Sequence, residues 1–173
     1  MSSIYFGLGS NLGDREQNLS AALDKLSTLG KIICVSKVYE TEAWGGVPQP
    51  DYLNACVRVD THSRIAPPKL LKTIKVFEHE LGRVPSIRWG ARKIDIDILL
   101  VDDEVYHSDE LDIPHIRIPE RLFVLVPLRD IVSEDWRHPE TGKTVQDMLA
   151  PHAGESVPLM THTKLKSLSR ATT

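Results

Sequence analysis

Residues 88–100 read RWGARKIDIDILL and place two aspartates inside an otherwise apolar stretch. From Ile94 to Asp97 the isoleucines and aspartates alternate strictly, which is the period of a β-strand. Side chains two positions apart point to one face of a strand, so Asp95 and Asp97 share a face, with backbones roughly 7 Å apart. The run beyond Asp97 is apolar on both faces and predicts an interior strand. The face opposite the aspartates is predicted to consist of Ile94, Ile96, Ile98 and Leu100.

A solvated strand face is the alternative interpretation of this pair. Aspartate is a poor strand residue, and two like charges on one face repel each other unless a cation lies between them. Mg²⁺ commonly takes one or two protein carboxylates together with phosphate oxygens. Guanidinium groups bind phosphate oxygens in a bidentate manner. Four cations lie just upstream, namely Arg83, Arg88, Arg92 and Lys93. The combination predicts a site for Mg²⁺ and a polyphosphate.

The bulk properties indicate one ordinary globular domain. The chain has 173 residues, of which 41% are hydrophobic and 26% charged, and its net charge is −3. We expect a single domain over residues 1–158 and a flexible tail over residues 159–173. The charge argues against a nucleic-acid partner, and no apolar run is long enough to cross a membrane. We expect a cytoplasmic monomer, leave a weak dimer open, and assign Cys34 and Cys56 as reduced core thiols.

The order of predicted elements is β-α-β-β-α-β. Strands are expected over residues 3–8, 31–41, 53–60 and 94–101, and helices over residues 15–29, ended by Gly30, and 67–81. This is the ferredoxin-like order, so the predicted fold is α+β, with helices packed on a mostly antiparallel sheet. A short strand near Val105, a strand over residues 122–128 and a short helix over residues 144–149 are expected to follow.

Three motifs invite functions that their context excludes. Gly7-Leu8-Gly9 lacks the third glycine of a dinucleotide-binding fingerprint, because Leu12 occupies that position. Gly142-Lys143-Thr144 lacks the first glycine of a phosphate-binding loop, because Arg137 stands there, and is interpreted as a turn before a helix. The element order also suits an RNA-binding sheet, but LNACVRVD at residues 53–60 carries no aromatic residue for stacking bases.

Several segments, in order, resemble 6-hydroxymethyl-7,8-dihydropterin pyrophosphokinase, a family of folate-pathway enzymes. The most specific is RWGARKIDIDIL at residues 88–99, and the similarity covers roughly residues 3–150. Supporting segments are GLGSNLGD at 7–14, YETEAWG at 39–45, PDYLN at 50–54, IPH at 113–115 and ERLFVLVPL at 120–128. Pro85, Ala91 and Ile116 depart from residues that the family often has at these positions.

The resemblance implies a reaction and its cofactors. The family transfers a pyrophosphoryl group from ATP to the hydroxymethyl oxygen of the pterin and releases AMP. It implies that Asp95 and Asp97 hold two Mg²⁺ ions that bridge the triphosphate, and that Arg83 and Arg92 bind the phosphates and act in catalysis. On the ATP side it implies Arg88, Trp89, His115 and Arg121, and at the adenosine end Leu71, Lys75, Glu78 and Ile98.

The residues expected to bind the pterin are inferred partly from side-chain chemistry and partly from the family resemblance. Tyr52 and Asn54 are two positions apart at a strand start and share a face. A flat heterocycle suits an aromatic stack and an amide at its polar edge. The resemblance implies that Tyr52 and Phe123 are the stacking rings and that Asn54 reads the ring edge. It adds contacts from the segment Thr41, Glu42, Ala43 and Trp44.

Two other functions stay open for this site. A metal-dependent nucleotidyltransferase would use the same groups and release pyrophosphate from ATP. A non-catalytic ferredoxin-like domain would bind a nucleotide or another small ligand without turnover. The loops over residues 42–50 and 82–92 are rich in glycine, proline or charge, and we expect them to close over substrate.

Overall fold

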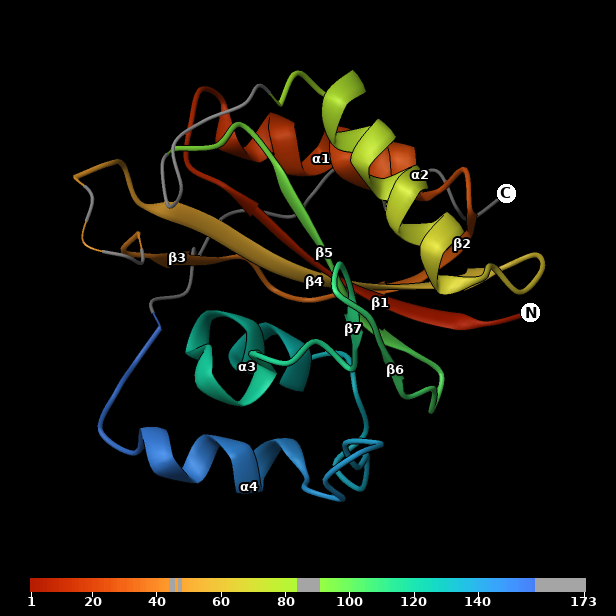
Figure 1. Ribbon diagram of the computed structural model, residues 1–173. Helices are drawn as coiled ribbons and strands as arrows, with labels where there is room; N and C mark the ends of the chain where they lie inside the picture. Colours follow the sequence, from red (N-terminus) through yellow and green to blue (C-terminus); the bar gives the residue numbers. More distant parts are fainter. Residues whose placement is uncertain (44–45, 47, 84–90, 158–173) are drawn as a thin grey trace.

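A five-stranded antiparallel sheet forms the centre of the molecule (Figure 1). The computed structural model describes residues 1–43, 46, 48–83 and 91–157. The strands lie in the order β2 (Gly30–Val35), β4 (Tyr52–Thr61), β1 (Ser3–Ser10) and β5 (Asp95–Val101), and β3 (Tyr39–Thr41) also pairs with β4. The predicted ferredoxin-like order is confirmed, whereas the interior position predicted for the aspartate strand is wrong, because β5 ends the order.

Helices cover both faces of this sheet (Figure 1). Helices α1 (Arg15–Leu26) and α2 (Pro67–Glu80) pack on one face. The other face carries α3 (Leu122–Arg129) and α4 (Val145–Leu149). The small hairpin of β6 (Tyr106–His107) and β7 (Asp112–Ile113) contacts β5, and its Leu111 and Ile113 belong to the core beneath α1 and α2. Short 3-10 turns, η1 (Ile118–Glu120) and η2 (Ala150–His152), precede α3 and follow α4. The sheet therefore separates two hydrophobic cores.

The connection between α1 and β2 differs from its prediction. Helix α1 begins as expected, because the Gln17 N–H donates to the Asp14 carboxylate at 3.1 Å. It ends at Leu26, and Gly30 is the first residue of β2 rather than a helix cap. A Cβ on Gly30 would lie 2.1 Å from the Asp60 carbonyl oxygen. Glycine is needed here because β4 approaches closely.

The strand predicted over residues 31–41 is broken at Ser36. Both β2 and β3 pair with the same edge of β4, at Val57–Thr61 and Tyr52–Asn54 respectively. Between them the Ser36 N–H donates to the Cys56 carbonyl, and the Ser36 hydroxyl accepts from the Cys56 N–H, both at 2.8 Å. A side chain thus replaces one step of the backbone ladder.

The strand predicted over residues 122–128 is wrong, because this segment is helix α3. Its buried residues are Val124, Leu125, Pro127 and Leu128, which form a helical stripe against the sheet. A short apolar run has no periodicity that separates a buried strand from a buried helix. Packing on β4 therefore decides the conformation here, against the strand preference of the residues.

A β-bulge changes the faces of β5 near its end. The register with β1 pairs Phe6 with Ile98 and Tyr5 with Leu100, so Leu99 is the extra residue. Ile94, Ile96 and Ile98 lie in the core beneath α1 and α2, as predicted. Leu99 and Leu100 both lie in the core beneath α3 and α4, so the face predicted for Leu100 is wrong.

The remaining sequence predictions for the fold have mixed outcomes. Thr144 caps α4, since the Asp147 N–H donates to its hydroxyl at 3.1 Å, which confirms the turn and helix start after Gly142. Both cysteines are free, with Cys56 buried and Cys34 only half-buried. Among the described residues, no helix is long and apolar enough to cross a membrane. The predicted tail over residues 159–173 lies outside the described residues, and the extent of the domain stays a prediction.

Candidate active site

A cavity of about 300 Å³ lies over the sheet where β4, β1 and β5 run side by side. Its floor is β1, where Gly7 pairs with Asp97 and Gly9 pairs with Asp95. On the other side of β1, Gly9 pairs with Asn54. A Cβ on Gly9 would lie 3.4 Å from both the Asn54 Oδ1 and the Tyr52 Cδ1. The glycines keep the floor open between the aspartates and the polar side chains of β4.

Asp95 is held by two arginines from the two ends of one loop. Arg83 Nη1 donates to Asp95 Oδ1 at 3.0 Å, and Arg92 Nη1 donates to the same oxygen at 3.3 Å. Residues 84–90 between them lie outside the described residues. The Asp95 side chain is 28% exposed, so its carboxylate faces the cavity. Both ends of the basic segment therefore converge on one carboxylate.

The negative charge of Asp97 is less closely compensated than that of Asp95. The cation beside it is Arg121, whose Nη1 lies 3.7 Å from Asp97 Oδ2. Burial, and next the negative charge of Asp95, raise the pKa of Asp97 to about 7, against the opposing charge of Arg121. A partly buried carboxylate beside a like charge favours an added proton or metal ion. The pair therefore has the oxygen ligands, and in Asp97 the weakly compensated carboxylate, that suit Mg²⁺.

Asp95 and Asp97 form a pair of candidate metal ligands rather than part of a larger cluster of described residues. In the part of the chain that the structure describes, no group of three or more His, Cys, Asp or Glu side chains is placed to hold an ion. One or two carboxylates are the usual protein contribution to a Mg²⁺–nucleotide site, with phosphates and water supplying the other ligands. Asp95 and Asp97 fit that pattern.

His115 reaches the cavity from the segment after β7. Its N–H donates to the Leu99 carbonyl at 2.9 Å, beside the bulge in β5. Its Nδ1 accepts from the Arg117 N–H at 3.2 Å, so the neutral ring carries its proton on Nε2. Burial, and next the charge of Arg121, lower the pKa of His115 to about 4. At neutral pH this ring is an uncharged hydrogen-bond donor.

The residues expected to bind the pterin gather on the opposite side of the cavity. Thr41, Tyr52, Asn54 and Phe123 all line it. Asn54 Nδ2 donates to Thr41 Oγ1 at 2.7 Å, which fixes the orientation of the amide. The Arg121 guanidinium lies 5.6 Å from the Phe123 ring centre, a cation–π distance. Aromatic and amide groups thus lie within one cavity with the carboxylates.

The residues expected at the adenosine end are not gathered in this cavity. Leu71 and Lys75 line a separate hollow of about 470 Å³ on α2, together with His79 and Glu110. Ile98 is 3% exposed and belongs to the hydrophobic core. Of the residues expected on the pterin side, Ala43 does not line the first cavity, whereas its neighbour Glu42 does. Trp44, Arg88 and Trp89 lie outside the described residues.

Glu78 occupies an unexpected position between α2 and β5. It is only 7% exposed, and its Oε2 accepts from the Ile96 N–H at 3.0 Å and pairs with Arg83 Nη1. Burial raises the pKa of Glu78, while the Ile96 N–H and Arg83 oppose that rise. The structure thus places Glu78 behind the aspartate pair.

The sequence analysis rejected Gly7-Leu8-Gly9 as a dinucleotide-binding fingerprint and gave the two floor glycines no role in the site. The strand expected to end at Leu8 continues to Ser10 and includes Gly9. Two glycines with one residue between them inside a strand signal a close approach of other groups, and this signal was available in the sequence. No sequence signal placed Cys56 on the lining, where it lies opposite Gly7.

The fold and the cavity define a class of protein. A ferredoxin-like α+β sheet carries paired carboxylates, arginines and an aromatic–amide wall around one cavity. This arrangement is that of a domain built to handle a phosphorylated ligand beside a flat ring.

Comparison with known proteins identifies the family. Residues 5–133 match the family described as 7,8-dihydro-6-hydroxymethylpterin-pyrophosphokinase (HPPK). The 2-amino-4-hydroxy-6-hydroxymethyldihydropteridine pyrophosphokinase of Aquifex aeolicus is 42% identical over 131 residues, covering 76% of this chain and 81% of the relative. Its namesake in Porphyromonas gingivalis is 43% identical over 147 residues, covering 81% of this chain and 96% of the relative. The chain belongs to the HPPK family.

Other matches are to longer proteins. Folic acid synthesis protein fol1 of Schizosaccharomyces pombe is 40% identical, and the match covers 84% of this chain but 20% of that protein. A crystal structure of Plasmodium falciparum HPPK-DHPS superimposes with a TM-score of 0.69 at 17% identity, covering 87% of this chain. This chain spans 45% of that solved chain. At such low identity the likeness supports the fold alone.

Proposed function

We propose that this protein transfers a pyrophosphoryl group from ATP to the hydroxymethyl group of 6-hydroxymethyl-7,8-dihydropterin, giving AMP and the pterin diphosphate for folate synthesis. The observation that carries the proposal is one cavity lined by Asp95 and Asp97 on one side and by Tyr52 and Asn54 on the other. Membership of the HPPK family supports the same substrates.

Asp95 and Asp97 are the proposed metal ligands. Two Mg²⁺ ions bound there with the triphosphate would neutralise charge that develops on the transferred phosphates. The expected two ions and their bridging role rest on the family resemblance. The support from this chain is the shared strand face of the two carboxylates and the raised pKa of Asp97.

Cationic and neutral donors would orient the phosphates. Arg83, Arg92 and Arg121 already surround the aspartates at 3.0–3.7 Å, within reach of a triphosphate bound there. His115 would donate from Nε2 to a phosphate oxygen as an uncharged ring. In the reaction the pterin oxygen attacks the β-phosphorus in line, the bond to the α-phosphate oxygen breaks, and the hydroxyl proton is released.

The pterin would lie against the aromatic wall. Tyr52 and Phe123 supply ring faces, and Asn54, held by Thr41, supplies an acceptor and a donor for the polar ring edge. The adenosine would extend toward α2, where Leu71 and Lys75 line the second hollow. A cytoplasmic location and a monomeric state belong to the same proposal.

Product analysis tests this function directly. Purified protein is incubated with ATP, Mg²⁺ and the hydroxymethyl pterin, and the nucleotide products are separated by anion-exchange chromatography. We expect AMP in equal amount to the pterin diphosphate, and none when the pterin or Mg²⁺ is omitted. ADP as the product would contradict the proposal, pyrophosphate release would indicate a nucleotidyltransferase, and binding without any product would indicate a sensor.

A further inference from the structure

Glu78 is a buried carboxylate that links helix α2 to the aspartate strand. Its Oε2 accepts from the Ile96 N–H at 3.0 Å, and Ile96 stands between Asp95 and Asp97. The same oxygen pairs with Arg83 Nη1. Since buried carboxylates are rare unless paired, Arg83 is the partner that makes this position tolerable.

The chain turns at the end of α2, and this turn brings Arg83 back beside Glu78. The helix ends at Glu80, and Gly82 has a φ of +87°, in the left-handed region that favours glycine. The Arg83 N–H then donates to the Glu78 carbonyl at 3.0 Å. Backbone and side chain of Arg83 are therefore both bound to Glu78, and the basic segment starts from a fixed point.

Arg83 also contacts the Asp95 oxygen that a metal ion would bind. Its Nη1 contacts Glu78 and lies 3.0 Å from Asp95 Oδ1. A metal ion that binds Asp95 competes with this guanidinium for the same oxygen. Glu78 extends from α2 to β5, and neither Glu78 nor Arg83 lines the cavity, so an ion that enters there to bind Asp95 leaves the Glu78–Arg83 pair intact.

We propose that Glu78 is a positioning residue that keeps Arg83 beside Asp95, both before a metal-bound nucleotide arrives and after it takes over the Asp95 carboxylate. The released face of Arg83 then meets the phosphates at a fixed place, because its anchor does not move. This inference rests on the proposed function for its nucleotide, and on the present contacts for the anchor.

A double-mutant cycle separates this role from a merely structural one. The variants are Glu78→Gln, Arg83→Gln and both together, since glutamine still accepts from the Ile96 N–H but lacks the charge. We expect Glu78→Gln to lower kcat/KM roughly tenfold or more, the effect of losing one charge-assisted contact. In the Arg83→Gln background it should change kcat/KM by less than about twofold, because its partner is already gone.

Metal binding gives a second readout that needs no turnover. In nucleotide-free protein, Mn²⁺ titrated under electron paramagnetic resonance should bind several-fold tighter to Arg83→Gln, because a competing cation is removed. It should also bind tighter to Glu78→Gln, because Arg83 without its anchor no longer stays on the Asp95 oxygen. The double variant should match Arg83→Gln.

Control variants show which results would contradict the inference. Glu80→Gln, on the exposed end of the same helix and paired with Lys25, should leave rate and Mn²⁺ binding unchanged. If Glu78→Gln fails to fold, Glu78→Asp keeps the charge and should retain more activity than Arg83→Gln. Equal losses from Glu78→Gln with and without Arg83 would overturn the role. A wild-type protein that forms no AMP would overturn the proposed function instead, and the Mn²⁺ cycle would still decide the anchor.

Discussion

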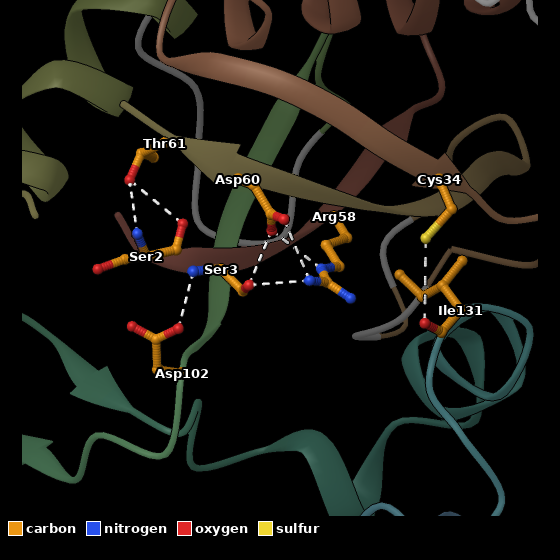
Figure 2. A network of polar contacts seen from close by, with 8 residues as sticks. All are labelled: Ser2, Ser3, Cys34, Arg58, Asp60, Thr61, Asp102 and Ile131. Carbon is orange, nitrogen blue, oxygen red and sulfur yellow. Dashed lines mark hydrogen bonds and ion pairs between the residues drawn. The ribbon is translucent and has the colours of Figure 1, made fainter. Parts of the chain in front are cut away.

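The sheet carries two clusters of aspartate and arginine, and they differ in how completely each charge is paired. In the first, distant from the cavity, Arg58 Nε and Nη2 donate to the two oxygens of Asp60 at 3.0 and 3.2 Å (Figure 2). Ser3 Oγ donates to Asp60 Oδ1 at 2.7 Å and accepts from Arg58 at 3.1 Å. Each group in this cluster has its partner at hydrogen-bonding distance.

The second cluster, around Asp95 and Asp97, pairs its charges less evenly, because Asp95 has two arginines within 3.3 Å while Asp97 has its arginine at 3.7 Å. Burial alone would raise the pKa of Asp60, but hydrogen bonds from Ser3 and Arg58 outweigh burial, and the pKa lies below its usual value. Asp97 is shifted the other way, to about 7, because its arginine is 3.7 Å distant and a second carboxylate is near. The comparison shows that contact distances, rather than residue types, distinguish a structural charge cluster from one prepared for a ligand.

The largest contrast between the clusters is expected in turnover. Asp95→Asn and Asp97→Asn should each lower the rate of AMP formation about 10³-fold, because the metal bridge to the phosphates is lost. Asp60→Asn is the matched control and should keep the rate within about twofold. Initial rates at saturating ATP and pterin measure all three. Retained Mg²⁺-dependent turnover in the double variant at Asp95 and Asp97 would refute the assignment.

For stability we expect the opposite order, in which Asp60→Asn is more damaging than the substitutions at the cavity. Asp60→Asn removes one partner of a satisfied ion pair and should lower the free energy of unfolding by about 1–2 kcal/mol. Urea denaturation at pH 7 measures the change, and Ser3→Ala should give a smaller loss in the same direction. An unchanged midpoint for Asp60→Asn would mean that the network in Figure 2 contributes nothing to stability.

The order of the core elements was predictable because periodicity determines which faces are buried. The helical stripe of Leu19, Leu23 and Leu26 and the alternation from Ile94 to Asp97 needed no tertiary information. The break at Ser36 and the bulge at Leu99 were not predictable, since each depends on a partner strand. Helix α3 was missed because its apolar run fits a strand equally well until the packing on β4 is known.

In the candidate site, too, some features were predictable from the sequence and others were not. The shared face of Asp95 and Asp97 follows from the strand period alone. The position of Glu78 does not, because it requires the end of α2 to lie against β5 and the turn at Gly82 to bring Arg83 back. Family resemblance named Glu78 but assigned it to the adenosine end, whereas its contacts here are with Arg83 and Ile96.

The smallest expected effect is a gain in stability at the proposed metal site. The pKa of Asp97 rises on folding from about 3.8 to about 7, so its contribution to stability is present at low pH and is lost as pH rises through 7. In EDTA, Asp97→Asn should therefore unfold at a higher temperature than wild type, with a difference that grows from pH 4 to pH 7 and is constant above. We expect about 1 kcal/mol, or about 3 °C, at pH 8, less than a fully buried group would give, because the side chain is 31% exposed.

Asp60→Asn should behave in the opposite sense in the same scans. The lowered pKa of Asp60 gives stability that is present above its unfolded value and lost only as pH falls through the folded one, so this variant is less stable than wild type at pH 8. Opposite signs at pH 8 for two identical aspartate-to-asparagine changes would separate the metal-site cluster from the structural one without any substrate. If Asp97→Asn is also destabilised across this range, the Asp97 carboxylate is already balanced by the protein, and the charge argument for a metal ion at this position fails.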